Sequence, residues 1–128
     1  MVVDTMPLDR IVAFLNTAQP DACIAFYGDA LGFRFVKDDG FALVFDAFGT
    51  MIRIVKARAV HPAQGTVLGW QVDDIDETIE QLTQAGVVFE RFPGFAHAEN
   101  GVFTFPGGDK VAWFKDPDGN VLSVSQHV

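Results

Sequence analysis

Apolar and polar residues alternate along two similar stretches of the chain, and each stretch predicts several β-strands and one helix. In the first stretch, an alternating segment at 10–16 is followed by Pro20, which suits the first turn of a helix, and by apolar residues spaced as one helical face. Gly32 is the expected end of that helix. Three further strands are predicted, at 33–37, 41–45 and 50–56. The first half is therefore predicted to be β-α-β-β-β.

The same order of elements repeats after a polar linker at 61–65. A strand is predicted at 66–72, and the next helix begins at Asp74, with Glu77 three residues on as in a capping box. Gly86 is the expected end of this second helix. The remaining strands are predicted at 87–90, 110–115 and 121–126, with a long loop over 91–109. The chain thus contains an internal duplication.

The last two predicted strands are joined by Asp116-Pro117-Asp118-Gly119-Asn120, which has proline and glycine where a type I turn favours them. Together with Phe26-Tyr27 in the first helix and the two helix-Gly-strand junctions, this pattern resembles the vicinal-oxygen-chelate superfamily. That superfamily includes glyoxalases, extradiol dioxygenases, fosfomycin-resistance enzymes and bleomycin-resistance proteins. The resemblance implies an α+β fold in a single domain at 1–128. It would consist of two tandem βαβββ modules, at 8–58 and 66–127, whose curved mixed sheets form half-barrels around a cleft.

Because side chains alternate between the two faces of a strand, the predicted strands can be sorted into faces. One face is uniformly apolar and is expected to pack under the helices: Ile11, Ala13, Leu15, Ile52, Ile54, Leu68, Trp70, Val72, Leu122 and Val124. The opposite face is mixed and is expected to line the cleft: Arg10, Val12, Phe14, Asn16, Met51, Arg53, Val55, Val67, Gly69, Gln71, Val121, Ser123 and Ser125. Trp113 fits either face, as a core residue or as a stacking platform.

In the metal-binding members of the vicinal-oxygen-chelate superfamily, histidine, glutamate or glutamine side chains of the cleft face coordinate the metal. Carried over by motif, the four ligand positions are Val12, Arg53, Val67 and Ser123. A divalent ion needs about three or four N, O or S donors, which these side chains do not supply. We therefore expect no metal and no other cofactor.

Arg53 is the most informative residue of the cleft face, because a guanidinium among apolar residues is costly unless an anion meets it. It is a candidate anchor for a ligand carboxylate or phosphate. The alternative is an ion pair with an acidic side chain such as Asp46 or Glu99. The candidate ligand-binding residues are Arg53, Phe14, Met51, Gln71, Ser123, Trp113 and Phe103.

The loop at 91–109 carries four phenylalanines among glycines and prolines. It is either an aromatic lid over the cleft or a segment buried against a partner subunit or the outside of the sheets. Within it, His97 with Glu99 beside it is a weak candidate for a general acid or base. Cys23, the single cysteine, falls on the apolar stripe of the first helix and is expected to behave as a small hydrophobe.

The composition of the chain argues against some classes of binding partner. The formal net charge of -8 argues against nucleic acid, whose phosphates would be repelled. No apolar run approaches the roughly 20 residues of a membrane helix, and the first residues lack the features of a leader, so we expect a cytoplasmic protein without membrane contact. Open sheet edges and apolar cleft surface favour a homodimer.

Three functions remain after these exclusions. The first is a metal-independent binder of a small organic molecule, for sequestration or resistance, similar to the bleomycin-resistance branch of the family. The second is a lyase, isomerase or dioxygenase that uses a relocated metal site or a metal-free acid/base such as His97. The third is a non-catalytic module that binds another protein.

Overall fold

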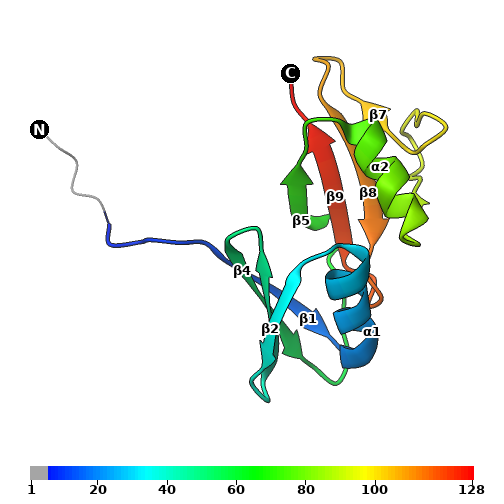
Figure 1. The fold of residues 1–128 in the computed structure, drawn as a ribbon. Coiled ribbons are helices and arrows are strands. Elements are labelled where there is room, and N and C mark those ends of the chain that lie inside the picture. Colours follow the sequence, from blue (N-terminus) through cyan, green and yellow to red (C-terminus); the bar gives the residue numbers. More distant parts are fainter. Residues whose placement is uncertain (1–5) are drawn as a thin grey trace, which may run out of the picture.

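A computed structural model describes residues 6–128, which form two mixed β-sheets with the helices packed on one side (Figure 1). The first sheet has the order β1-β4-β3-β2, with β1 parallel to β4 and the other pairs antiparallel. Its strands are β1 (Val12–Thr17), β2 (Arg34–Asp38), β3 (Ala42–Ala47) and β4 (Thr50–Lys56). Between β1 and β2 the chain forms α1 (Pro20–Ile24), which continues into the π-helical turn η1 (Ala25–Ala30).

The second sheet repeats this topology in the order β5-β9-β8-β6, with the short β7 also paired to β8. Its strands are β5 (Thr66–Gln71), β6 (Phe89–Glu90), β7 (Phe103–Thr104), β8 (Lys110–Lys115) and β9 (Val121–Gln126), and its helix is α2 (Ile75–Gln84). Neither sheet closes into a barrel. The predicted α+β fold with two tandem βαβββ units is confirmed.

Two predictions of element boundaries in the second module were wrong. The strand expected at 87–90 is reduced to Phe89–Glu90, because the Val87 N–H is bonded to the Leu82 carbonyl at 3.0 Å and so closes the end of α2. The loop expected over 91–109 is not continuous, since it contains β7.

β1 begins at Val12 rather than at Arg10, because Val12 opposite Met51 is the first pair of its ladder with β4. Ile11 was therefore wrongly assigned to the core and is 78% exposed. Residues 6–11 run away from the two sheets in Figure 1. The expectation that the first residues are not a leader sequence depends on Met1 to Thr5. These five residues lie outside the described residues. Within residues 6–128, no helix combines the length and apolarity needed to cross a membrane.

The helices pack as their sequence patterns predict. Asp74 accepts a hydrogen bond from the Glu77 N–H at 3.1 Å, so it caps α2, and Ile75 and Ile79 are buried on the sheet side of that helix. Cys23 is buried on α1, and this burial raises the pKa of its thiol to about 12. The thiol therefore stays protonated and serves as a small apolar group.

A buried carboxylate joins the two modules. The Tyr27 hydroxyl, on η1, donates to Asp116 Oδ2 at 2.7 Å, at the start of the turn between β8 and β9. Asp116 also accepts hydrogen bonds from the backbone N–H groups of Asp118 and Asn120, each at 2.9 Å, and from Asn120 Nδ2 at 2.8 Å. The same Asn120 amide donates to the carbonyl of Asn16, at 3.2 Å. The C-terminal turn is thereby tied to both the first helix and the first strand.

Further contacts of the same turn strengthen this junction. The Thr17 hydroxyl donates to Asp118 Oδ2 at 2.5 Å, and the Ala18 N–H donates to Asp118 Oδ1 at 2.9 Å. The Gln19 amide donates to the carbonyl of Pro117 at 2.8 Å. Gly119 adopts a φ of 87°, which permits the turn to close at low cost. The turn that the sequence predicts as a hairpin is therefore also the contact between modules.

Replacing Tyr27 with phenylalanine tests the importance of this junction. Tyr27→Phe removes one donor from a buried carboxylate, and we expect a loss of about 1.5–3 kcal/mol in the free energy of unfolding. Urea denaturation followed by circular dichroism measures it. Thr104→Val, which removes an exposed hydroxyl, is the matched control. A change within about 0.5 kcal/mol for Tyr27→Phe, the range of neutral surface substitutions, would contradict a supporting role for the junction.

Candidate ligand-binding faces of the two sheets

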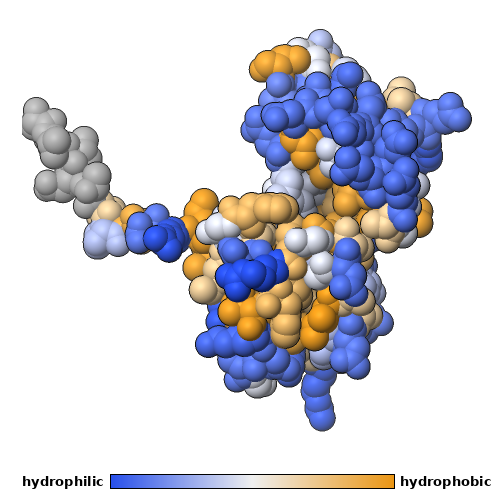
Figure 2. Space-filling model, viewed as in Figure 1, coloured by the Kyte–Doolittle hydropathy of each residue, from blue (hydrophilic) through white to orange (hydrophobic). Residues whose placement is uncertain are grey.

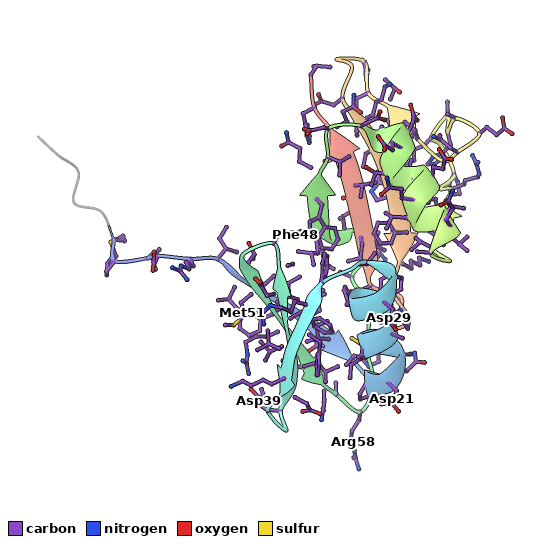
Figure 3. The ribbon with its side chains drawn as sticks, viewed as in Figure 1. Asp21, Asp29, Asp39, Phe48, Met51 and Arg58 are labelled. Atoms are coloured by element: carbon purple, nitrogen blue, oxygen red, sulfur yellow. The ribbon has the colours of Figure 1, made fainter. Side chains whose placement is uncertain are left out.

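The face of the first sheet that points away from α1, here called the first open face, consists of Val12, Phe14, Met51 and Arg53. Val12 lies opposite Met51 and Phe14 lies opposite Arg53 in the β1–β4 ladder, so these four side chains share one side of the sheet. Phe14 is 64% exposed and Met51 is 44% exposed. Figure 3 shows Met51 on the side of the sheet opposite the helix. The chain by itself therefore leaves this apolar face uncovered.

The Arg53 guanidinium forms an ion pair with Asp39, with 2.7 Å between Nη2 and Oδ2. Asp39 belongs to the turn between β2 and β3, and its other oxygen accepts the N–H groups of Phe41 and Ala42. The Ala42 N–H and Arg53 hold the pKa of Asp39 well below its usual range. Of the partners considered from the sequence, Asp46 pairs instead with Arg34, at 3.6 Å. An anionic ligand at Arg53 would therefore have to share or displace Asp39.

The second open face is the corresponding side of the second sheet and carries Trp113, Ser123 and Gly69. Trp113 lies opposite Ser123, and Ser123 lies opposite Gly69, so all three share one face. Trp113 thus belongs to the expected cleft side, and its Nε1–H donates to the Thr66 hydroxyl at 3.1 Å. Gly69 leaves room for Ser123, since a Cβ on Gly69 would come within 2.4 Å of the Ser123 Oγ.

The aromatic residues of the 91–105 segment pack on Trp113. The ring centroids of Phe95 and Trp113 are 5.4 Å apart, those of Phe92 and Trp113 are 5.5 Å apart, and Phe103 lies edge-on to Phe95 at 4.8 Å. The loop therefore covers part of the second open face with its own phenylalanines. Beside them, a pocket of about 310 Å³ opens between Trp113, these rings and the segment 64–66.

His97 is held inside this loop by both ring nitrogens. Nδ1 lies 2.7 Å from the Gly101 carbonyl, which can only accept, so the hydrogen-bond network assigns the proton to Nδ1. The Phe92 N–H donates to Nε2 at 3.0 Å. Glu99 contributes its backbone carbonyl, which accepts from Arg91. In this arrangement His97 ties the loop together, and any proton transfer by it would first break one of these bonds.

The sequence candidates fall into separate groups. Phe14, Met51 and Arg53 lie together on the first sheet. Ser123, Trp113 and Phe103 lie together on the second. Gln71, opposite Ser125 and two residues after Gly69 on β5, also lies on the face of the second sheet that carries Ser123 and Trp113. The side chain that sequence reasoning did not assign is Asp39, which pairs with Arg53 from the turn between β2 and β3. Phe95, one of the four loop phenylalanines, packs on Trp113.

The four positions that the sequence motif predicts as family ligand positions lie on both sheets. Val12 and Arg53 lie on the first sheet, and Val67 and Ser123 lie on the second. Among residues 6–128, no three His, Cys, Asp or Glu side chains come close enough together to hold a metal ion.

Comparison with known families gives one match over nearly the whole chain. The model of the family described as Glyoxalase/Bleomycin resistance protein/Dioxygenase superfamily matches residues 8–124. No curated protein matches the chain.

Solved structures of that family have the same fold. A lactoylglutathione lyase from Agrobacterium tumefaciens is 23% identical, with a TM-score of 0.70 over 94% of this chain and 95% of that one. A superfamily member from Sphaerobacter thermophilus is 22% identical, with a TM-score of 0.73 over 96% of this chain and 100% of that one. A member from Nocardioides is 16% identical, with a TM-score of 0.72 over 99% of this chain and 87% of that one. At these identities the likeness concerns the fold alone.

Replacing His97 tests whether it organises the aromatic loop. His97→Leu removes the acceptor of the Phe92 N–H and the donor to the Gly101 carbonyl, so we expect faster hydrogen exchange of the Phe92 amide and a change in Trp113 fluorescence. His61→Leu, in an exposed linker, is the control. Unchanged exchange at Phe92 would show that the loop does not depend on His97.

Proposed function

Since this chain belongs to the Glyoxalase/Bleomycin resistance protein/Dioxygenase superfamily, we propose that it is a metal-independent member that binds a small organic molecule on its open faces, for sequestration or resistance. The observation that carries the proposal is the set of side chains at the family's ligand positions. Two are valines, one is a guanidinium and one is a hydroxyl. Valine has no donor atom, a guanidinium has no free lone pair for a metal, and one hydroxyl is fewer than the about three or four donors required, so these residues do not fit a divalent metal ion.

The chemistry of the two faces supports an aromatic organic ligand. Trp113 offers a large planar surface, and neighbouring aromatic rings favour stacked or edge-on contacts with a second ring. The first open face adds the apolar surface of Phe14 and Met51. Arg53 adds one cationic group that is already neutralised by Asp39. The proposed ligand therefore has an aromatic or otherwise flat apolar body, and a carboxylate on it would compete with Asp39 for the guanidinium.

We further propose that two copies of the chain form the complete site. Phe14, Met51 and Val12 together leave an apolar surface in water, and surfaces of this kind are characteristic of protein or ligand interfaces. A second copy would cover this face and close a cleft over it, as a symmetric dimer permits. The expected role is binding rather than catalysis, since the one histidine near Trp113 has both ring nitrogens occupied.

Elemental analysis of untagged protein purified without chelator tests the absence of a metal. We expect far less than one equivalent of Zn, Ni, Mn, Fe or Co per chain, also after incubation with each ion and desalting. Ser123→Glu, which places a carboxylate at a ligand position, is the comparison variant. A stoichiometric metal in the unaltered protein would overturn the proposal and favour an enzyme of the lyase, isomerase or dioxygenase type.

Calorimetric titration with aromatic carboxylates tests the role of Arg53. For benzoate and salicylate, we expect Arg53→Ala to abolish measurable binding, and Asp39→Asn to strengthen it severalfold because the guanidinium is released from its ion pair. Arg34→Ala, which breaks a comparable ion pair with Asp46 on the same sheet, is the matched control and should bind normally. Light scattering on the same samples reports whether binding follows dimer formation. Equal affinity in the Arg53 and Arg34 variants would exclude Arg53 as the anchor.

A further inference from the structure

A second pocket, of about 310 Å³, lies where the two modules meet on the helix side of the sheets. We call it the seam pocket; its principal walls are Phe33, Phe48, Trp70, Gln71, Leu82 and Phe114. Trp70 and Phe114 come from the sheet side that packs under the helices, so the seam pocket and the open faces lie on opposite sides of the second sheet. Its volume is at the lower end of the range for small-molecule sites, which is about 300–1,000 Å³.

Three aromatic rings in contact form one wall of the pocket. The ring centroid of Phe33 lies 5.2 Å from that of Trp70 and 5.5 Å from that of Phe48, and Phe48 stands edge-on to Phe33 at 89°. The residues that complete the lining are also uncharged: Leu31, Val72, Thr78, Gln81 and Val124. A charged ligand would lose its hydration there without a compensating partner. The seam pocket therefore suits a neutral molecule with a flat ring.

Phe48 occupies its position at a conformational cost. It is the first residue of the two-residue turn between Ala47 and Thr50, and both Phe48 and Gly49 have positive φ, at 53° and 96°. Turns of this kind favour asparagine followed by glycine, and a bulky side chain at positive φ is an outlier. Its ring is nevertheless 80% exposed, so burial does not repay the strain. Figure 3 shows Phe48 where the first sheet approaches the second, at the rim of the seam pocket.

One polar group at the rim remains free to bind a ligand. The Thr78 hydroxyl donates to the Asp74 carbonyl at 2.8 Å, and the Gln81 amide donates to Glu77 at 3.3 Å. The Gln81 side-chain carbonyl oxygen Oε1, at the rim, accepts no hydrogen bond within residues 6–128. It offers an acceptor to a molecule in the pocket.

We propose that the seam pocket binds a small uncharged aromatic molecule with one hydrogen-bonding group, such as a phenol or an aromatic amide. The ring packs against the wall formed by Phe48, Phe33 and Trp70, and an N–H or O–H group of the ligand donates to Gln81 Oε1. The site is separate from the open faces, so its test does not depend on the proposed function. Phe48 is a specificity residue, since the strained turn places its side chain at the rim of the pocket.

The two tryptophans distinguish the two sites. We would titrate the ¹⁵N-labelled full chain with benzamide and follow the indole N–H signals, since Trp70 lines the seam pocket and Trp113 lines the second open face. Benzamide should shift Trp70 in a saturable way and leave Trp113 unmoved. Benzoate and benzylammonium, which match benzamide in size but carry charges, should bind the seam pocket at least tenfold more weakly.

Substitutions test the parts of the site. Phe48→Asn should weaken benzamide binding at least tenfold and leave the melting temperature unchanged or raised, because asparagine suits the turn. Phe41→Asn removes a phenylalanine that is 66% exposed and lies outside the pocket, and it should leave binding unchanged. Gln81→Leu should weaken benzamide binding about fivefold.

Several results would overturn the proposal. These are a benzamide shift at Trp113 instead of Trp70, equally strong binding of benzamide and benzoate as read from the Trp70 signal, or unaltered benzamide binding in Phe48→Asn. Light scattering that shows Phe48→Asn converting a dimer to monomers would overturn it too, because the rim would then be a contact between copies of the chain.

Discussion

The buried carboxylate of Asp116 is the group on which the arrangement of the two modules depends. It closes its own turn through the N–H groups of Asp118 and Asn120, and it accepts the Tyr27 hydroxyl from the other module. A buried carboxylate is tolerated only when its oxygens accept hydrogen bonds. Separating the modules would remove the hydrogen bond that Tyr27 donates to Asp116. Burial and the nearby carboxylate raise the pKa of the Tyr27 hydroxyl, so it remains a donor over the whole working pH range. A turn that closes a hairpin thereby also orients two sheets.

This junction joins the modules on their helix sides, and the opposite faces of both sheets are left open as a consequence. The two open faces differ in how much of their apolar surface is exposed to water. The second is partly covered by the chain's own phenylalanines, which pack on Trp113 and are held by His97. The first keeps Phe14 and Met51 exposed beside the Arg53–Asp39 pair. Figure 2 shows apolar surface gathered over the first module and between the two modules. Such surface is costly for a protein to leave open unless another molecule covers it.

The same junction also creates the seam pocket, which neither module contains alone. Phe48 comes from the first sheet and Trp70 from the second, and Phe33 touches both rings. The open faces and the seam pocket differ in electrostatics, since only the first open face contains a guanidinium. Under the two proposals, this chain offers distinct surfaces to a carboxylate and to a neutral ring, and the strained turn places Phe48 at the rim of the seam pocket.

The sequence by itself determined the order of elements, because strand alternation, the Asp74 cap and the turn at Asp116 are local signals that depend on neighbouring residues. It also predicted the faces of β1, β4, β5 and β9, with Leu15, Ile54 and Leu122 buried as expected. Tertiary structure decided what the local pattern does not contain. The partner of Arg53 is 14 residues away, across a turn, and the partner of Tyr27 is 89 residues away. Trp113 has a definite face only through its register with Ser123, and the pocket at Phe48 exists only where two modules meet. The spacing of apolar residues determines which side of its own strand or helix a residue faces. Ion pairs and pockets depend on the distances between different elements, and these distances are set by how the elements pack.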